Sequence, residues 1–348
     1  MIFEGSPGWQ SARAARAAGP GADPEELRRA YLELLKLSLC DLAGTTTMSV
    51  GKSPEGRVSS RQISGEELRL RSAGMDWPLQ GLTMVGLTRL DDLQMCVETV
   101  VDGDVEGDLI EAGAWRGGAS MLMRATLDAL GVEDRVVVAA DSFQGFPTED
   151  EQEGLNQVDF LSISLEEVEA NFARFGLDRG VRFVPGFFQD TLPGLSGGRW
   201  AVVRLDGDTY ATTWLSLESL YPGLSVGGYL IVDDYGALEE CHEAVEDFRT
   251  VHGITERLEQ VDWTGMRWQR ERSDPIEPAA PPRARPRATK PGAPRDVERE
   301  RDSRVPTEEE LDLSGRVAAA EAEIRRLRGS PIAGPRAWLA QKRRGKTG

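Results

Sequence analysis

The chain has 348 residues, a length that allows either one α/β domain with extensions or two domains. No apolar run approaches the roughly 20 residues of a membrane-spanning helix, so the sequence predicts no membrane association. Residues 1–21 lack the continuous apolar segment of a secretory signal, and the three widely spaced cysteines fit neither a disulfide framework nor a zinc cluster. We therefore expect a cytoplasmic protein.

Charge is distributed unevenly along the chain. Residues 271–348 contain 18 basic and 13 acidic side chains, a net charge of +5; the total is −17, which leaves −22 on residues 1–270. A surface of this sign repels the phosphate backbone of nucleic acids. The body of the protein is therefore not expected to bind nucleic acid.

The amino-terminal part is predicted to comprise a disordered segment, residues 1–22, and a helical region, residues 23–106. The first helix spans residues 24–42, because Asp23 suits the N-cap and a proline follows at the first helical position. Gly44 is expected to end this helix in a left-handed turn.

Two irregular segments are predicted to cover a ligand as lids. Residues 45–62 are small and polar and predict a mobile loop, and residues 149–159 form the second such segment. Between them, the spacing of Ser64 and Glu67 is that of a capping box and predicts a short helix. A further helix is expected over residues 86–101, where apolar residues fall on one face.

Residues 107–270 alternate short apolar runs with helical stretches. Continuous apolar runs predict a parallel sheet covered by helices on both faces. The last two runs follow one another without a helix, so we expect an antiparallel hairpin at that edge. The fold class is therefore α/β, a doubly wound and mostly parallel sheet of seven strands at residues 108–112, 135–140, 181–184, 200–205, 229–232, 257–261 and 266–269, with helices at residues 117–130, 164–175, 209–220 and 238–251.

The carboxyl-terminal part differs in composition from the body. Residues 271–306 are rich in proline and arginine and predict a disordered linker. Residues 307–348 are expected to form a short amphipathic helix, over residues 307–328, and a basic tail. The helix could contact a protein partner, although a solitary, marginal helix is the alternative at this length.

The ends of the first two predicted strands carry residues suited to a nucleotide-like ligand. Glu111, Gly113 and Gly117 form an acidic-x-Gly-x-x-x-Gly pattern, which is similar to that of S-adenosylmethionine-dependent methyltransferases. Asp141 follows the second strand, where a carboxylate can accept both hydroxyls of a ribose. The alternatives are an ordinary glycine-containing turn and a capping aspartate.

Carboxylates gather after the fourth and fifth strands, at Asp206, Asp208, Asp233 and Asp234. Carboxylates held close together repel, so either some are protonated or a hard divalent cation lies among them. Asp206, Asp233 and Asp234 suit octahedral Mg²⁺, and the alternative is a pair of solvated loops. The chain has only two histidines, which excludes a histidine-rich metal site and a triad hydrolase.

Five segments resemble those of the macrocin O-methyltransferases, which methylate sugar hydroxyls in the biosynthesis of macrolides and related antibiotics. The resemblance covers roughly residues 25–270, and its motifs lie at residues 107–118, 140–145, 184–193, 205–210 and 227–235. It implies a class I methyltransferase fold, which is Rossmann-like, and the use of S-adenosylmethionine and Mg²⁺. Three positions depart from the family pattern: Asp92, Ala112 and His242.

The resemblance also implies roles for individual residues. Glu111, Gly113 and Trp115 are expected near the methionine end of the cofactor and Asp141 at its ribose. Ser142 and the loop after Gly186 are expected at the adenine. The resemblance assigns the metal to Asp206, Asp233 and Asp234, and Asp206 is also the candidate base.

The sequence thus predicts an O-methyltransferase that uses S-adenosylmethionine and Mg²⁺ to methylate a sugar hydroxyl of a small-molecule glycoside. A catechol or another vicinal diol is the alternative acceptor, because it offers the same pair of oxygens. A different alternative is a catalytically silent module that acts through its carboxyl-terminal tail. The amino-terminal helices also make a homo-oligomer plausible.

Overall fold

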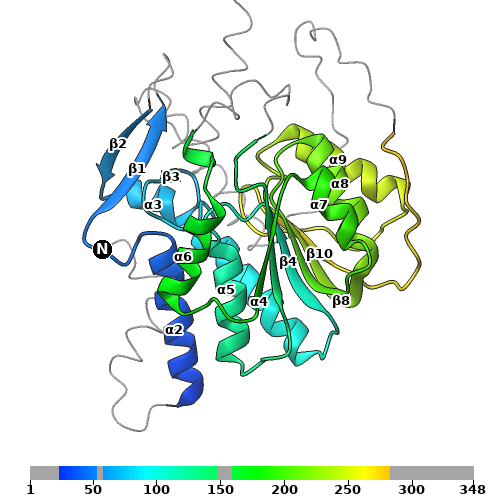
Figure 1. Ribbon diagram of the computed structural model, residues 1–348, viewed down its shortest axis with the longest axis horizontal. Coiled ribbons are helices and arrows are strands. Elements are labelled where there is room, and N and C mark those ends of the chain that lie inside the picture. The colour runs from blue at the N-terminus through cyan, green and yellow to red at the C-terminus, as the bar shows by residue number, and fades with distance from the viewer. Residues whose placement is uncertain (1–22, 53–57, 147–158, 283–348) are drawn as a thin grey trace, which may run out of the picture.

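The computed structural model of the chain describes residues 23–52, 58–146 and 159–282. Within them, strands form a large central sheet and a small amino-terminal sheet (Figure 1). The predicted disordered segment 1–22, nearly all of the second lid and the chain beyond residue 282, with its predicted amphipathic helix, lie outside the described residues.

The central sheet has seven strands in the order β6-β5-β4-β7-β8-β10-β9. β6, β5, β4, β7 and β8 are parallel, and β10 runs antiparallel to both β8 and β9. The predicted mostly parallel α/β sheet with an antiparallel edge is therefore confirmed. The strands are β4 (Asp108–Ala112), β5 (Val137–Asp141), β6 (Val181–Pro185), β7 (Trp200–Leu205), β8 (Leu224–Val232), β9 (Glu259–Gln260) and β10 (Met266–Gln269).

One strand is longer than expected. β8 begins at Leu224 rather than at Tyr229, because Gly227 and Gly228 lie inside it. Glycine weakens a strand and hides it from a pattern of apolar residues.

Helices cover both faces of the central sheet (Figure 1). Successive strand residues alternate between two apolar cores: Leu109 and Val137 belong to one core, Ile110 and Val138 to the other. The first core is closed by α2 (Pro24–Leu39), α4 (Leu87–Asp102), α5 (Gly118–Ala129) and α6 (Leu165–Phe175), and the second by α8 (Tyr210–Leu220), α9 (Glu239–Val251) and the short segments α7 (Phe188–Thr191), η2 (Leu192–Leu195) and η3 (Tyr221–Gly223).

The first helix begins as expected but ends earlier. The Asp23 side chain accepts a hydrogen bond from Glu25 N at 3.1 Å, which confirms the predicted N-cap. The helix ends at Leu39, and Asp41, with φ 57°, takes the left-handed position that was expected of Gly44. Aspartate adopts this conformation more readily than most residues, so the glycine is not needed.

The segment predicted as a mobile loop, residues 45–62, is instead part of a three-stranded antiparallel sheet. Arg71, buried beside this sheet, explains how polar strands are stabilised: it donates to Met48 O at 2.8 Å and to both carboxylate oxygens of Asp76 at 2.8 Å. These hydrogen bonds satisfy the backbone oxygen of Met48 and pair the charges of Arg71 and Asp76. A search for apolar runs in the sequence does not detect strands that are stabilised in this way. The sheet consists of β1 (Thr47–Lys52), β2 (Val58–Ile63) and β3 (Trp77–Pro78).

The short helix α3 (Glu67–Ser72) lies where the capping box predicted one, but the box itself is not formed. Glu66 occupies the N-cap position and no side chain caps the helix. Ser64 contributes its backbone oxygen to Glu67 N at 3.1 Å. Gly65, with φ +57°, turns the chain between the two residues.

The last described residues, 271–282, form neither helix nor strand. They contact the second core through Ile276, and Ala279 N donates to Glu218 Oε2 at 3.2 Å.

Among the helices in the described ranges, none combines the length and the apolar character that crossing a bilayer requires.

Candidate active site

The turn between β4 and α5 brings backbone close to two neighbouring strand ends. Gly113 has φ +101°, and its N–H donates to Ala140 O at 2.8 Å. A Cβ atom at this position would lie 2.0 Å from the backbone oxygen of Asp206. The turn therefore requires glycine both for its dihedral angle and for the approach of β7.

We predict that Gly113→Ala destabilises the fold by about 3 kcal/mol or more, because strain and a steric clash add at one site. Gly131→Ala is the matched control: φ is +74° there, and a Cβ atom would meet nothing within 4 Å. The control is expected to lose about 1 kcal/mol from the left-handed backbone alone. Urea unfolding measures both, and equal losses would show that the approach to Asp206 is unimportant.

Asp141 connects this turn to the end of β5. Its carboxylate accepts hydrogen bonds from Trp115 N at 2.9 Å and from Phe143 N at 2.9 Å. Burial raises the pKa of Asp141, although these hydrogen bonds oppose the rise. Ser142 Oγ also lies 3.4 Å from the carboxylate oxygen that accepts from Phe143 N, so the carboxylate is held in one orientation from several sides.

The other two residues expected at the cofactor lie beside Asp141. Gly186, with φ +135°, donates its N–H to Asp141 O at 3.0 Å, and Ser142 Oγ donates to Gly145 O at 2.6 Å. Glu111, Gly113 and Trp115 line a pocket at the carboxyl ends of the strands, whereas Asp141, Ser142 and Gly186 lie outside its lining. The structure thus places the six residues at the adjoining ends of β4, β5 and β6. Three of them line the pocket and three lie outside its lining.

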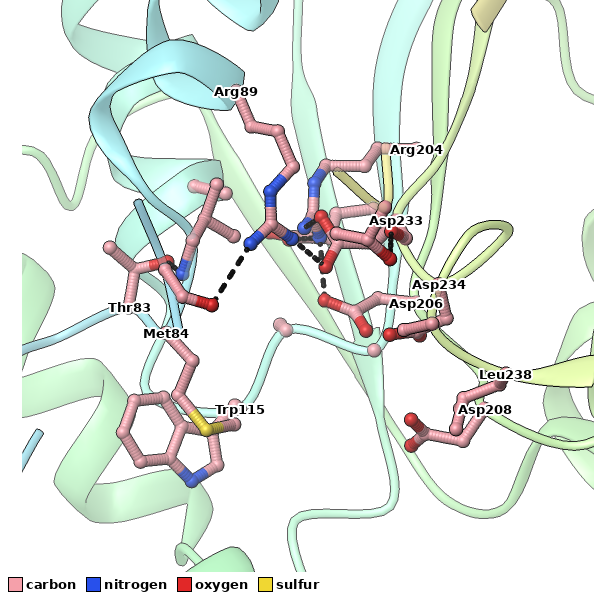
Figure 2. A pocket seen from close by; sticks show the side chains of 18 of the residues that line it. Thr83, Met84, Arg89, Trp115, Arg204, Asp206, Asp208, Asp233, Asp234 and Leu238 are labelled. Atoms are coloured by element: carbon pink, nitrogen blue, oxygen red, sulfur yellow. Dashed lines mark hydrogen bonds and ion pairs between the residues drawn. The ribbon is translucent and has the colours of Figure 1, made fainter. Parts of the chain in front are cut away.

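Two buried arginines converge on Asp233 (Figure 2). Arg89, on α4, and Arg204, on β7, each donate a short hydrogen bond to a different carboxylate oxygen of Asp233. Arg204 also donates to Glu111 at 2.5 Å and to Asp206 at 3.0 Å. Asp233, one of the predicted metal ligands, is therefore ion-paired on both of its oxygens.

Three other carboxylates form a compact group. Asp206, Asp208 and Asp234 each offer one oxygen, and these oxygens lie within 4.8 Å of one another. Asp234 Oδ2 is buried and accepts no hydrogen bond from the described residues. Three carboxylates at this spacing, one of which has a buried oxygen without a hydrogen bond, fit a hard divalent cation such as Mg²⁺. Asp208 was noted in the sequence but was not assigned to the metal.

The pKa values of these acids reflect burial and charge. Burial, together with Asp206 and Asp233, raises the pKa of Asp208 to about 7, and burial raises that of Asp234 well above its usual value. Burial also raises the pKa of Glu111 to about 7, although Arg204 opposes the rise. Burial disfavours the anion of Asp233 as well, but Arg89 and Arg204 outweigh it and lower the pKa of Asp233. The pocket thus concentrates negative charge that two arginines compensate only in part.

The pocket has a polar end and an apolar wall. The polar end consists of the carboxylates and the two arginines, and Figure 2 shows Trp115 and Met84 on the side away from Asp208. Arg89 and Arg204 were not among the functional residues predicted from the sequence. Arg204 had a visible signal, a charged residue inside the fully buried strand β7, whereas Arg89 had none. The apolar wall includes Trp77, Met84, Val85, Trp115, Leu161, Leu238 and Trp263.

Comparison with known proteins agrees with this geometry. Residues 30–270 match the family described as macrocin O-methyltransferase. The chain is 45% identical to an 8-demethyl-8-(2,3-dimethoxy-α-L-rhamnosyl)-tetracenomycin-C 4′-O-methyltransferase of Streptomyces olivaceus, over 70% of this chain and 94% of that protein. It is 44% identical to the mycinamicin III 3″-O-methyltransferase of Micromonospora griseorubida, over 69% and 96%. The structure of the O-methyltransferase NovP is similar, with a TM-score of 0.62 and 41% identity over 70% of this chain and all of that one.

The fold and the relatives are those of an S-adenosylmethionine-dependent O-methyltransferase. Within that class, the chain belongs to the macrocin O-methyltransferase family, because the match covers most of the chain and the relatives align over nearly their full length. The resemblance seen in the sequence motifs is confirmed.

Proposed function

We propose that the enzyme uses S-adenosylmethionine and Mg²⁺ to methylate a hydroxyl on the sugar of a glycosylated natural product. The observation that carries the proposal is the group of Asp206, Asp208 and Asp234 beside a pocket at the strand ends. The names of the relatives support the class of acceptor, since the tetracenomycin and mycinamicin enzymes are named for methylation of glycosylated compounds.

The cofactor is expected beside the β4–α5 turn. Glu111, Gly113 and Trp115 would contact its methionine end and Asp141 its ribose, with Ser142 and the loop after Gly186 at the adenine. This assignment is supported by the place of Glu111, Gly113 and Trp115 in the pocket lining and by the position of Asp141 at the end of the neighbouring strand β5.

Asp206 and Asp234 are the proposed metal ligands, because the family resemblance assigns both to the metal and both belong to the compact carboxylate group. The third ligand is either Asp233 or Asp208. Asp233 remains eligible because an oxygen bonded to an arginine still has a second lone pair. When bound, Mg²⁺ would stabilise a developing alkoxide and hold two neighbouring acceptor oxygens.

The reaction requires the acceptor hydroxyl to lose its proton as it attacks. The oxygen forms a bond to the methyl carbon, the bond from that carbon to sulfur breaks, and the proton passes to a carboxylate. Asp206 is the proposed base, because it is half-buried at the pocket, and burial, with Asp233 nearby, raises its pKa. Arg204 holds the carboxylate of Asp206 in place at 3.0 Å.

A catechol is the second candidate acceptor. It presents two adjacent oxygens and could bind at the same carboxylates.

The alternative of a catalytically silent module that acts through its tail is disfavoured, because the chain belongs to a family of enzymes. Contact between the tail and a protein partner remains a proposal, and so does a homo-oligomer.

The test is incubation of the full chain with S-adenosylmethionine and a panel of glycosides and catechols, with products followed by mass spectrometry. We expect a gain of one methyl group on a glycoside, loss of at least about 100-fold in rate with EDTA, and recovery on adding Mg²⁺. Product formation that is unaffected by EDTA overturns the metal. Methylation of catechols alone overturns the acceptor class.

A further inference from the structure

The turn between β9 and β10 contacts the chain at the end of β8, where Asp233 and Asp234 follow. We refer to residues 262–265 as the Trp263 turn. The Thr264 hydroxyl donates to the backbone oxygen of Asp233 at 2.8 Å, which fixes the turn to the end of β8. Trp263 and Thr264 both line the pocket that contains Asp206, Asp208 and Asp234.

Asp262 makes the Trp263 turn rigid. One of its oxygens accepts hydrogen bonds from Thr264 N at 3.0 Å and from Gly265 N at 2.8 Å. Its other oxygen accepts from Arg89 Nε at 3.1 Å, and Arg89 in turn contacts Asp233. The turn is therefore held from within and from α4, and the pocket wall that it forms is preorganised.

The indole of Trp263 is oriented by its polar edge. Its Nε1–H donates to Ala73 O at 2.8 Å, and the Arg89 guanidinium carbon lies 5.8 Å from the ring centroid. The side chain is partly exposed and forms part of the pocket lining. The indole is thus held in a defined orientation in the lining of the pocket that also contains the carboxylates.

The other two tryptophans of the pocket wall are less suited to stack on a sugar ring. Trp77 is only 3% exposed and stacks on Phe160. Trp115 packs against Phe160, with ring centroids 5.3 Å apart, and against the Arg116 guanidinium at 4.3 Å. Trp263 alone of the three is joined through its own turn to Asp233.

We propose that Trp263 is the surface on which the acceptor sugar lies during methyl transfer. One face of a pyranose ring exposes C–H groups, which pack on an indole, while its hydroxyls project from the ring edge, where Asp206, Asp208 and Asp234 would receive them. Trp263 is then a specificity-determining residue that binds the acceptor and takes no part in the chemical step. This inference rests on the proposed function, since it takes a glycoside as the acceptor.

Steady-state kinetics of Trp263→Leu and Trp263→Phe test this role. Leucine keeps apolar volume but loses the flat face, so KM for the glycoside is expected to rise about 10-fold or more, with kcat and KM for S-adenosylmethionine within about 2-fold. Phenylalanine keeps a flat face and is expected to restore most of the affinity. Tyr31→Ala, an exposed aromatic residue on α2, is the control and should leave all constants unchanged.

A Trp263→Leu variant with an unchanged KM for the glycoside overturns the proposal. An equal rise in the KM for the glycoside and the KM for S-adenosylmethionine also overturns it. Thermal unfolding of each variant identifies a loss of fold. If Trp263→Leu does not fold, Trp263→Met replaces it, since methionine also lacks the flat face: a rise of at least 3-fold confined to the glycoside KM supports the role, and an unchanged value refutes it. If the wild-type enzyme methylates no glycoside, the proposed function itself fails, and this inference fails with it.

Discussion

Asp206→Asn is expected to lower kcat by about 10²- to 10⁴-fold while leaving the affinity for S-adenosylmethionine within about 3-fold. The substitution keeps the size of the side chain but removes its charge. Asparagine cannot accept the proton of the acceptor hydroxyl, and it is a weaker ligand for a hard cation than a carboxylate is. Both proposed roles of Asp206 are therefore lost together.

Single-turnover kinetics and calorimetric titration with S-adenosylmethionine measure the two quantities separately. Asp178→Asn makes the same chemical change at an exposed position between α6 and β6 and should behave as the wild type. A variant at Asp206 that kept a near-normal rate would show that Asp206 is neither the base nor an indispensable ligand.

The separate roles of base and ligand are distinguished by metal affinity measured without substrates. A ligand is expected to lower Mg²⁺ affinity when it is replaced, whereas a base that binds no metal is not. Comparing Asp208→Asn with Asp233→Asn in the same titration decides which of them is the third ligand. The two differ in the structure because Asp233 is held by two arginines and Asp208 lies within the compact carboxylate group.

The fold and the position of the site could be predicted from sequence because both depend on local patterns. Apolar runs that alternate with helical stretches define a parallel sheet, and the carboxyl ends of parallel strands meet at one edge. Gly113, Asp141 and Asp206 each follow such a run, so their proximity could be inferred without coordinates. Direct backbone contacts join their segments, since Gly113 N bonds to Ala140 O and Asp206 N bonds to Ala112 O, each at 2.8 Å.

The rest of the site depends on contacts that no local pattern contains. Arg89 reaches Asp233 from a helix far away in sequence, and Trp263 lies in a short turn at the antiparallel edge. The strands of residues 45–62 were missed for a related reason. Polar side chains such as Ser49 are buried there, and Arg71, on a separate helix, satisfies the backbone oxygen of Met48. Long-range pairing of this kind overrides strand propensity.

Arg204→Leu is expected to destabilise the metal-free enzyme by about 3–5 kcal/mol at pH 8.5. Arg204 and Glu111 are both buried, with 2% of each side chain exposed, and their contact is 2.5 Å long. Removal of the guanidinium leaves Glu111 without its cation and Asp233 with only one. Arg199→Leu is the control, because its ion pair with Glu106 is well exposed and should contribute less than about 1 kcal/mol.

The loss is expected to be smaller at pH 6 than at pH 8.5. In the folded wild type, burial raises the pKa of Glu111 from its usual value of 4.5 to about 7. The positive charge of Arg204 opposes this rise. An acid whose folded pKa is raised loses stability as pH rises from the unfolded to the folded value. Without Arg204 the folded pKa of Glu111 is higher still. The wild type and the variant therefore diverge mainly above pH 7, where ionisation of Glu111 continues to destabilise only the variant.

Urea unfolding of both proteins at pH 6 and pH 8.5, without metal or cofactor, measures this difference. Adding Glu111→Gln to Arg204→Leu should recover part of the stability at pH 8.5, because it removes the uncompensated carboxylate. Glu111→Gln alone should not be stabilising to the same extent, since Arg204 then loses a partner. A deficit independent of pH, unrelieved by the second substitution, would indicate that Arg204 contributes through packing rather than through charge.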